Sequence, residues 1–252
     1  MTTAEFFLWT ALLFVIIFLR YLLFSGLYHY LFRWRWRDRF SKRIFHYQPE
    51  KGSAIKREII RSAGVSLIFA TAGISTLWLW VNEYTLLYLP FGERYWLWLL
   101  LSPTLFLAAQ ETYYYWTHRW MHRPGIYESV HRWHHESIET TAFTAFSFHP
   151  LEALLQAIFL PLIVLILPMQ VYIFLSLLTL MTLSATINHA GIEIFPASWE
   201  RLPILNKLIG ATHHDLHHKQ AQTNFGLYFT FWDEWMGTES HKYKARFKKH
   251  TS

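Results

Sequence analysis

Three stretches of the chain are almost wholly apolar and long enough to cross a lipid bilayer as helices. Residues 6–32 are interrupted only by Arg20 and His29, and residues 59–81 and 95–116 are similarly apolar. About 20 apolar residues at helical rise cross the hydrocarbon core. A cleaved signal peptide is not expected, because the first stretch is too long and lacks a basic leading region. The pattern therefore predicts transmembrane helices at these three places.

A fourth apolar stretch, residues 151–187, is much longer than one crossing requires. Pro161 and Pro168 lie inside it, and proline interrupts a helix because it lacks a backbone N–H group. We therefore expect two packed helices or a hairpin that turns back. Together the four stretches predict an all-α, polytopic membrane protein with about four transmembrane helices.

The distribution of basic residues predicts the orientation. Residues 33–61 contain ten Lys and Arg, residues 117–150 three and residues 188–252 eight. Two hairpins would place these segments, with 21 of the 23 basic residues, on one side, and the opposite loop, residues 82–94, holds only Arg94. By the positive-inside rule the basic side is cytosolic and the N-terminus lies outside. The arginine–tryptophan run at residues 33–39 suggests an interfacial anchor, with a docking surface for an acidic redox partner as the alternative.

The composition narrows the chemistry. The chain has no cysteine, which excludes disulfides, thiolate-bound haem, iron–sulfur clusters and cysteine zinc sites. It has 15 histidines, and eleven of them fall between His118 and His218. A metal here would have nitrogen and oxygen ligands. The net charge of +6 fits membrane orientation better than nucleic-acid binding, because 53% of the residues are hydrophobic.

Most of these histidines recur at spacings of three and four residues. The clusters are His118/His122, His131/His134/His135 and His214/His217/His218. Residues at these spacings share one face of a helix, so each cluster can present its imidazoles to one centre. A single pair would be an ordinary surface or core pair, but crowded neutral imidazoles gain little from one another unless a cation binds them. Eight imidazoles exceed what one ion needs, so we expect two ions in a cytosolic, helical, histidine-rich cap.

The histidines alone do not specify which metal element is bound. Imidazole binds zinc, copper, iron and nickel alike. A catalytic zinc site needs only three protein ligands and a water. The number of histidines therefore favours two redox-active irons that use O2, and a site at the membrane surface is placed to receive a lipid.

The three clusters resemble the histidine boxes of the fatty acid hydroxylase/sterol desaturase superfamily of membrane di-iron oxygenases. That superfamily has an HX3H box, an HX2HH box and a late HX2HH box around transmembrane hairpins. Flanking residues also match, over roughly residues 100–240: Glu111, Tyr115-Trp116, His149-Pro150-Leu151-Glu152, Asn224-Phe225-Gly226 and Trp232-Asp233-Glu234-Trp235-Met236-Gly237-Thr238. The last segment is closer to the sterol-desaturase branch.

The resemblance implies that the eight box histidines are catalytic metal ligands, and it adds His189 as a ninth ligand. Ala185 and Glu193 stand where some members carry a further histidine, and Glu193 is a candidate to complete the ligand set. Ligating imidazoles usually donate their other N–H group to an acceptor. The residues expected to support the ligands are Glu111, Asp215, His213 and Glu193, with Glu136 a weaker candidate. Asp233 is expected to brace local structure, and His149 to cap or orient the apolar hairpin.

The resemblance further implies hydroxylation or desaturation of a sterol-like or fatty-acyl lipid with O2. Electrons would come from a separate carrier of the cytochrome b5 or ferredoxin type, since the sequence shows no nucleotide-binding signature. The substrate-binding residues are not predicted individually. Candidate pocket walls are the aromatics Phe143, Phe146, Phe148, Tyr228 and Phe231.

Two other classes of function compete with this interpretation. A histidine-rich metal transporter or sensor would carry ionisable residues deep in several spans, whereas here only Arg20 does so. A zinc-dependent membrane hydrolase would have a three-ligand open site with a general base, which the surplus of histidines disfavours.

The expected organisation has three parts. Residues 1–94 form a transmembrane hairpin with a basic cytosolic linker, residues 95–240 the catalytic domain, and residues 241–252 a basic tail. The absence of cysteines, of N-glycosylation sequons and of a lysine retention signal favours a bacterial inner membrane over the endoplasmic reticulum.

Overall fold

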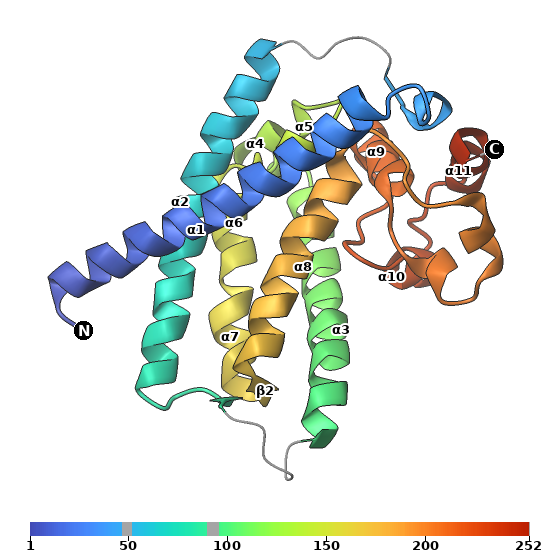
Figure 1. Cartoon of the computed structure of the whole chain (residues 1–252). Helices are drawn as coiled ribbons and strands as arrows, with labels where there is room; N and C mark the ends of the chain where they lie inside the picture. Colours follow the sequence, from blue (N-terminus) through green and yellow to red (C-terminus); the bar gives the residue numbers. More distant parts are fainter. Residues whose placement is uncertain (47–51, 90–95, 252) are drawn as a thin grey trace.

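The computed structural model describes residues 1–46, 52–89 and 96–251, and within these ranges the chain is mostly helical (Figure 1). The longest helices are α1 (Thr3–His29), α2 (Gly52–Val81), α3 (Trp96–Met121) and α8 (Val171–His189). The shorter α-helices are α4 (Tyr127–Val130), α5 (Arg132–His135), α6 (Pro150–Ala157), α7 (Phe159–Ile166), α9 (Ala211–Gln220), α10 (Phe231–Trp235) and α11 (Tyr243–Thr251). A π-helical turn η1 (Tyr30–Arg35) continues α1, and 3-10 turns occur at η2 (Ser41–Arg43), η4 (Ala142–Phe146), η5 (Ala197–Arg201) and η6 (Leu205–Lys207).

The fourth apolar stretch is a hairpin, as one of the two sequence interpretations expected. Its descending arm breaks into α6 and α7 at Ile158, three residues before Pro161, whose ring nitrogen cannot donate to the carbonyl of Ala157. The arm ends before Pro168, because the residue before a proline is disfavoured in helical conformation, and Leu167 is extended. Strand β2 (Met169–Gln170) then pairs in parallel with β1 (Leu87–Tyr88) before α8 returns.

Helix starts in this hairpin follow from local chemistry. His149 accepts a hydrogen bond from the backbone N–H of Leu151 and is followed by Pro150, a combination that favours helix initiation. The expected capping role of His149 is therefore confirmed. At α8, the side chain of Gln170 accepts from the N–H of Ile173 in the same way.

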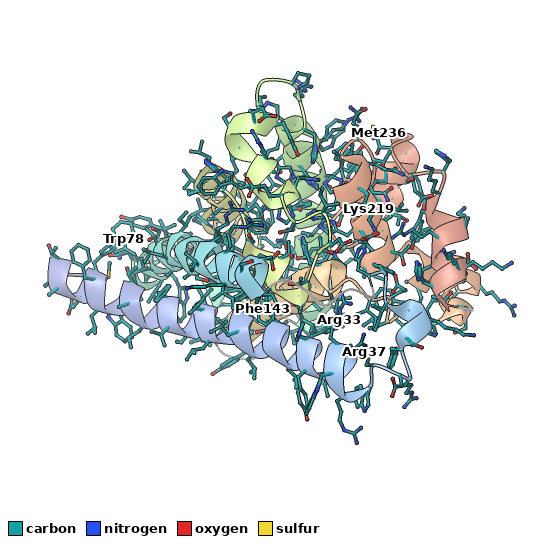
Figure 2. The ribbon with its side chains drawn as sticks, turned by 90° about the horizontal axis from the view of Figure 1, so that it is seen from above. Arg33, Arg37, Trp78, Phe143, Lys219 and Met236 are labelled. Atoms are coloured by element: carbon teal, nitrogen blue, oxygen red, sulfur yellow. The ribbon has the colours of Figure 1, made fainter. Side chains whose placement is uncertain are left out.

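All the histidine boxes lie at one end of the bundle. In Figure 1, α2, α3, α7 and α8 run side by side, α1 crosses them obliquely, and α4, α5 and α9 gather at the upper end. The β1–β2 pair lies at the opposite end (Figure 1). The segments that contain most of the basic residues therefore lie at the same end as the histidine boxes, as the two-hairpin prediction expected. Viewed from above in Figure 2, Arg33 and Arg37 lie at the end of α1 nearest the C-terminal segment. Arg94, Tyr95 and the predicted domain boundary between them lie outside the described residues.

Within the described residues, three helical segments are long and apolar enough to cross a membrane. They are Thr3–Arg35, Gly52–Val81 and Val171–His189, and Pro150–Ile166 is a shorter apolar segment. Large apolar side chains on their outer faces, such as Leu19 at 57% exposed, have the exposure expected of lipid-facing positions. The all-α membrane class is confirmed, and the number of four transmembrane helices stays a prediction.

Candidate functional site

Five histidines from four parts of the chain gather into one group, which we call the five-histidine group. Its members are His118, His122, His131, His135 and His217, and one nitrogen from each lies within 4.8 Å of the others. His118 lies at the end of α3, and His131 at the junction of α4 and α5. All but His122 are buried. Such a group could hold a metal ion.

Four further histidines form the four-histidine group. Its members are His134, His189, His214 and His218, again with nitrogens within 4.8 Å of one another and all buried. The ring centroids of His135 and His218, one from each group, are 4.7 Å apart, so the groups are adjacent. The structure thus brings together all nine histidines predicted as metal ligands.

The helical spacing suggested that all histidines of one box face the same centre, but the second and third boxes are each divided between the two groups. The pairs four residues apart stay together: His131 with His135, and His214 with His218. The middle histidine of each box belongs to the other group: His134 to the four-histidine group and His217 to the five-histidine group. Each HX2HH box therefore bridges the two groups, because the residue one position before the end of a pair points to a different side of the helix.

Inside both groups the Nε2 atoms face one another. The Nε2–Nε2 distance is 3.1 Å between His118 and His131, and 3.0 Å between His135 and His217. In the four-histidine group, the Nε2 atoms of His189 and His214 are 2.8 Å apart. Contacts this short require a proton or a cation between the nitrogens.

The hydrogen-bond partners of the outer ring nitrogens favour a cation over a proton. The Nδ1 atom of His118 donates to the carbonyl of Phe225 at 2.9 Å, and that of His217 to the carbonyl of Thr223 at 2.8 Å. His189 donates to the carbonyl of Ala185 at 2.7 Å. A carbonyl can only accept, so Nδ1 carries the proton and Nε2 of a neutral ring carries a lone pair. His131 likewise donates from Nδ1 to a carboxylate, that of Glu152, so the Nε2 atoms of His118 and His131 are acceptors facing each other, an arrangement that fits a bound metal cation.

Burial keeps these rings neutral. Desolvation, together with the neighbouring imidazoles of His118 and His189, lowers the pKa of His135 to about 3. Desolvation, with neighbouring imidazoles, also holds the pKa of His217 and His218 well below the ordinary value. Neutral imidazole is the form that ligates metals.

One carboxylate supports a ligand directly, and sequence reasoning did not identify it. His131 donates from Nδ1 to Oε2 of Glu152 at 2.7 Å, and both side chains are fully buried. Gln156, one helical turn later, donates to the other oxygen of Glu152 at 3.1 Å. An ionisable residue near the start of an apolar hairpin is costly without a partner, and that signal could have singled out Glu152.

Glu111 does not have the predicted role. Its carboxylate accepts three backbone N–H groups, from Leu227 at 3.0 Å, Tyr228 at 2.6 Å and Phe229 at 3.2 Å. The hydrogen bonds that it makes therefore hold a loop, not an imidazole. This loop also contains the Phe225 carbonyl that accepts from His118.

Glu193 and Asp215 are also corrected. Glu193 accepts from the N–H groups of Thr212, in the first turn of α9, and Phe195, so it caps the helix that carries the third box and belongs to neither histidine group. Asp215 binds the basic side chains of Lys219 and Arg246 instead of a ligand, and it pairs with His46. Its role is to hold α9 against α11.

The two remaining supporting candidates differ from expectation as well. His213 is fully buried outside both groups, with Nε2 3.7 Å from Asp233 and its ring against Tyr243. Glu136 pairs with Arg61 of α2 at 2.8 Å, which ties the second box to that helix. Asp233 does brace local structure, since it accepts from the N–H groups of Phe225 and Gly226.

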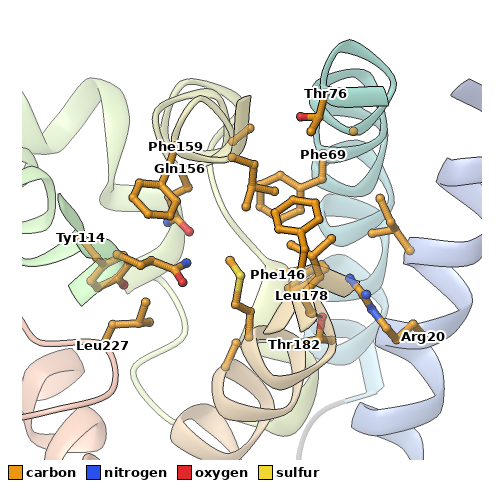
Figure 3. A pocket seen from close by; sticks show the side chains of 18 of the residues that line it. Arg20, Phe69, Thr76, Tyr114, Phe146, Gln156, Phe159, Leu178, Thr182 and Leu227 are labelled. Carbon is orange, nitrogen blue, oxygen red and sulfur yellow. Dashed lines mark hydrogen bonds between the residues drawn. The ribbon is translucent and has the colours of Figure 1, made fainter. Parts of the chain in front are cut away.

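A cavity of ≈ 370 Å³ lies among the membrane helices and reaches the four-histidine group (Figure 3). His189 and His214 line it together with apolar residues of α1, α2, α3, α7 and α8. Cavities of roughly 300–1,000 Å³ bind small organic molecules. Of the predicted pocket walls, Phe146, Phe148 and Tyr228 line the cavity.

The other two predicted pocket walls pack elsewhere. The Phe143 ring lies against His29 of α1. The Phe231 ring lies against Trp235. Neither lines the cavity.

Comparisons with known proteins agree with this geometry. Residues 103–238 match the model of the fatty acid hydroxylase family. The Delta(7)-sterol 5(6)-desaturase of Candida albicans is 28% identical over 196 residues, which cover 77% of this chain and 49% of the relative. The Aspergillus fumigatus enzyme of the same name is 27% identical over 211 residues, or 83% of this chain and 61% of the relative. The chain spans about half the length of the curated relatives it matches.

These relatives bear on the expected location. They come from fungi, which runs against the preference for a bacterial inner membrane. The multi-pass membrane setting itself is supported by the apolar helices.

No solved structure matches the chain significantly. The family model, however, covers more than half of the chain and all three histidine boxes. Other sterol desaturases match at 26% identity over 201 residues and at 32% over 122 residues. The chain therefore belongs to the fatty acid hydroxylase family, within the superfamily that also contains the sterol desaturases.

Proposed function

We propose that this chain is a membrane oxidoreductase that binds two iron ions and uses O2 to hydroxylate or desaturate a lipid. The observation that carries the proposal is the pair of adjacent, largely buried histidine groups whose Nε2 atoms face one another, one of them beside an apolar cavity. The five-histidine group would hold one ion and the four-histidine group the other. Bound iron would supply the oxidation by O2 that no amino-acid side chain can perform.

The protein's part in this reaction is binding, orientation and the exclusion of water. Carbonyl groups and Glu152 fix the imidazole rings so that Nε2 points inward. The apolar cavity would hold a sterol-like or fatty-acyl chain with one carbon close to His189 and His214. Its apolar walls keep water from the reacting carbon.

We further propose the setting in which the enzyme works. The fungal relatives favour the endoplasmic reticulum, with the histidine groups on the cytosolic side of the membrane. Electrons would come from a separate cytochrome b5-like or ferredoxin-type carrier. The sterol desaturases among the relatives support a sterol-like or related lipid as the substrate.

Metal analysis and oxygen uptake test the proposal together. We expect purified protein to contain about two irons per chain, in line with two ligand groups. It should consume O2 when given a reductant and the correct lipid. His134→Ala should abolish this uptake, whereas His241→Ala, an exposed histidine outside both groups, should leave it unchanged. One bound zinc without oxygen uptake would show that the chain is not an oxidase.

Lipid mass spectrometry identifies the product. Cells that express the wild-type chain should contain a lipid shifted by about +16 mass units for an added oxygen, or about −2 for two lost hydrogens, relative to cells that express His134→Ala. The sign of the shift distinguishes hydroxylation from desaturation.

A further inference from the structure

An arginine in the first apolar helix lies beside the cavity without a partner among the residues that the structure describes. Arg20 is near the middle of the span Thr3–Arg35 and lines the cavity. Its Nε atom is buried, and no hydrogen bond or ion pair joins the side chain to another of the described residues. A guanidinium group stays protonated in proteins and is costly in an apolar medium unless an acceptor or an anion meets it.

The cavity supplies no such anion from the protein. Among the described residues that line it, Arg20 is the only charged side chain, because His189 and His214 are neutral. Two buried carboxylates on the helices that form the cavity have other partners. Glu111 accepts from backbone N–H groups, and Glu152 accepts from His131. The positive charge is therefore complementary to something that enters the cavity.

We propose that Arg20 binds the anionic group of the lipid substrate, so that the substrate class is a lipid acid rather than a neutral lipid. A carboxylate matches the planar guanidinium, which can donate two parallel hydrogen bonds to it. The assignment of the cavity as the substrate pocket rests on the proposed function.

The position of Arg20 also indicates which part of the lipid reacts. In Figure 3, Arg20 enters from α1 on one side of the cavity, and Tyr114 and Leu227 lie on the opposite side. His189 and His214 belong to α8 and α9, not to the wall formed by α1. A lipid held by its acidic group at Arg20 on α1 would therefore present another of its carbons to the four-histidine group on α8 and α9.

Binding of two matched probes tests this assignment. The full chain in phosphatidylcholine nanodiscs is titrated with fluorescent cis-parinaric acid and with its methyl ester at about pH 8, where the acid is ionised. We expect the acid to bind the wild-type chain about tenfold more tightly than the ester, because one charge-assisted pair distinguishes them. Arg20→Gln should remove this preference by weakening the acid about tenfold while leaving the ester unchanged.

Control variants separate the pocket from general charge effects. Arg57→Gln removes a positive charge from an exposed position on α2 and should change neither affinity. Arg20→Lys keeps the charge and should retain part of the preference, so it serves as a second variant if Arg20→Gln does not fold. An equal affinity of the wild-type chain for acid and ester, or an equal loss of both in Arg20→Gln, would overturn the proposal. So would tighter binding of the neutral sterol dehydroergosterol that is independent of Arg20.

The binding measurement needs neither iron nor oxygen. A chain that fails to consume O2 but prefers the acid through Arg20 would contradict the proposed oxidation and not this assignment. A chain that oxidises a neutral sterol and shows no acid preference would overturn only the role of Arg20.

Discussion

Four imidazoles in the two groups are oriented by the atom that accepts their outer proton. For His118, His189 and His217 that atom is a backbone carbonyl, and for His131 it is a carboxylate. A carboxylate acceptor increases the electron density on the ring and so strengthens the bond from Nε2 to a metal. His131 is therefore the ligand whose affinity depends most directly on one side chain.

Glu152→Gln should weaken metal binding without unfolding the chain. Glutamine can still accept a hydrogen bond from His131 but carries no charge, and loss of such a partner typically lowers metal affinity by about 10–100-fold. Iron retained after dialysis against a graded series of chelator concentrations measures this. Glu128→Gln, which breaks an exposed pair with Arg132, is the matched control. Equal retention in both variants would contradict the role of Glu152.

Acid should destabilise the protein through the same buried rings. The pKa of His135 is about 3 and that of His213 about 4, both mainly lowered by burial, whereas an exposed histidine in the unfolded chain titrates near 6.5. As the pH falls below 6.5, the unfolded state takes up protons that the folded state does not, so stability decreases. Above that pH these groups contribute no pH dependence.

The thermal midpoint of metal-free protein in detergent should therefore fall steadily between about pH 7 and about pH 5. Bound iron should be released over the same range, because protons compete for the ligand nitrogens. A midpoint that stays level or rises as the pH falls would contradict the buried, neutral state of these histidines.

At the scale of single elements, short helices and tight turns bring the ligands to the groups. Histidines four apart, one pair at the start and end of α5 (His131 and His135) and one on α9 (His214 and His218), share a group, and the intervening histidine belongs to the other one. Helix α8 ends at His189, and Gly191 then turns the chain with a φ of 66°. A side chain at Gly191 would also come within 2.7 Å of the carbonyl oxygen of Thr140. This turn fixes where His189 points.

Gly191→Ala should destabilise the protein by about 1–3 kcal/mol, because a left-handed backbone and a steric clash act together. Its thermal midpoint and iron content should both fall. Gly26→Ala provides the comparison, since a methyl group there meets no atom within 4 Å inside α1 and should be neutral or stabilising by up to about 1 kcal/mol. Similar midpoints for the two variants would show that the turn is not constrained.

At the scale of the whole molecule, the hairpins separate two ends of a bundle. The histidine groups and the basic segments occupy one end, and the β1–β2 pair occupies the other (Figure 1). The absence of cysteine makes this arrangement easy to test by labelling. Asn82 and His241 are exposed positions near the two ends.

Asn82→Cys and His241→Cys should react with a membrane-impermeant maleimide from opposite sides of a sealed membrane. By the positive-inside rule, position 241 should be labelled only after the cytosolic face is opened. Labelling of both positions from the same side would contradict the predicted two-hairpin topology. The cysteine-free wild-type chain gives the background signal.

The local sequence determined the class of the protein and most of its candidate metal ligands. Apolar length, the positions of Pro161 and Pro168, and the histidine spacings depend only on short-range geometry, so they could be interpreted residue by residue. His189 could be predicted as a ligand only from the family resemblance, because it has no second histidine at helical spacing. Spacing thus identified eight of the nine candidate ligands, and the resemblance added the ninth.

The tertiary structure alone decided how these ligands are divided and what supports them. His131 meets His118 and Glu152 across loops and helices, and a helical period cannot specify such contacts between distant segments. For the same reason Glu111, Glu193 and Asp215 were assigned to imidazoles although backbone N–H groups and cations are their partners. A buried carboxylate must find some partner, and only the packing of the whole chain determines which one it is.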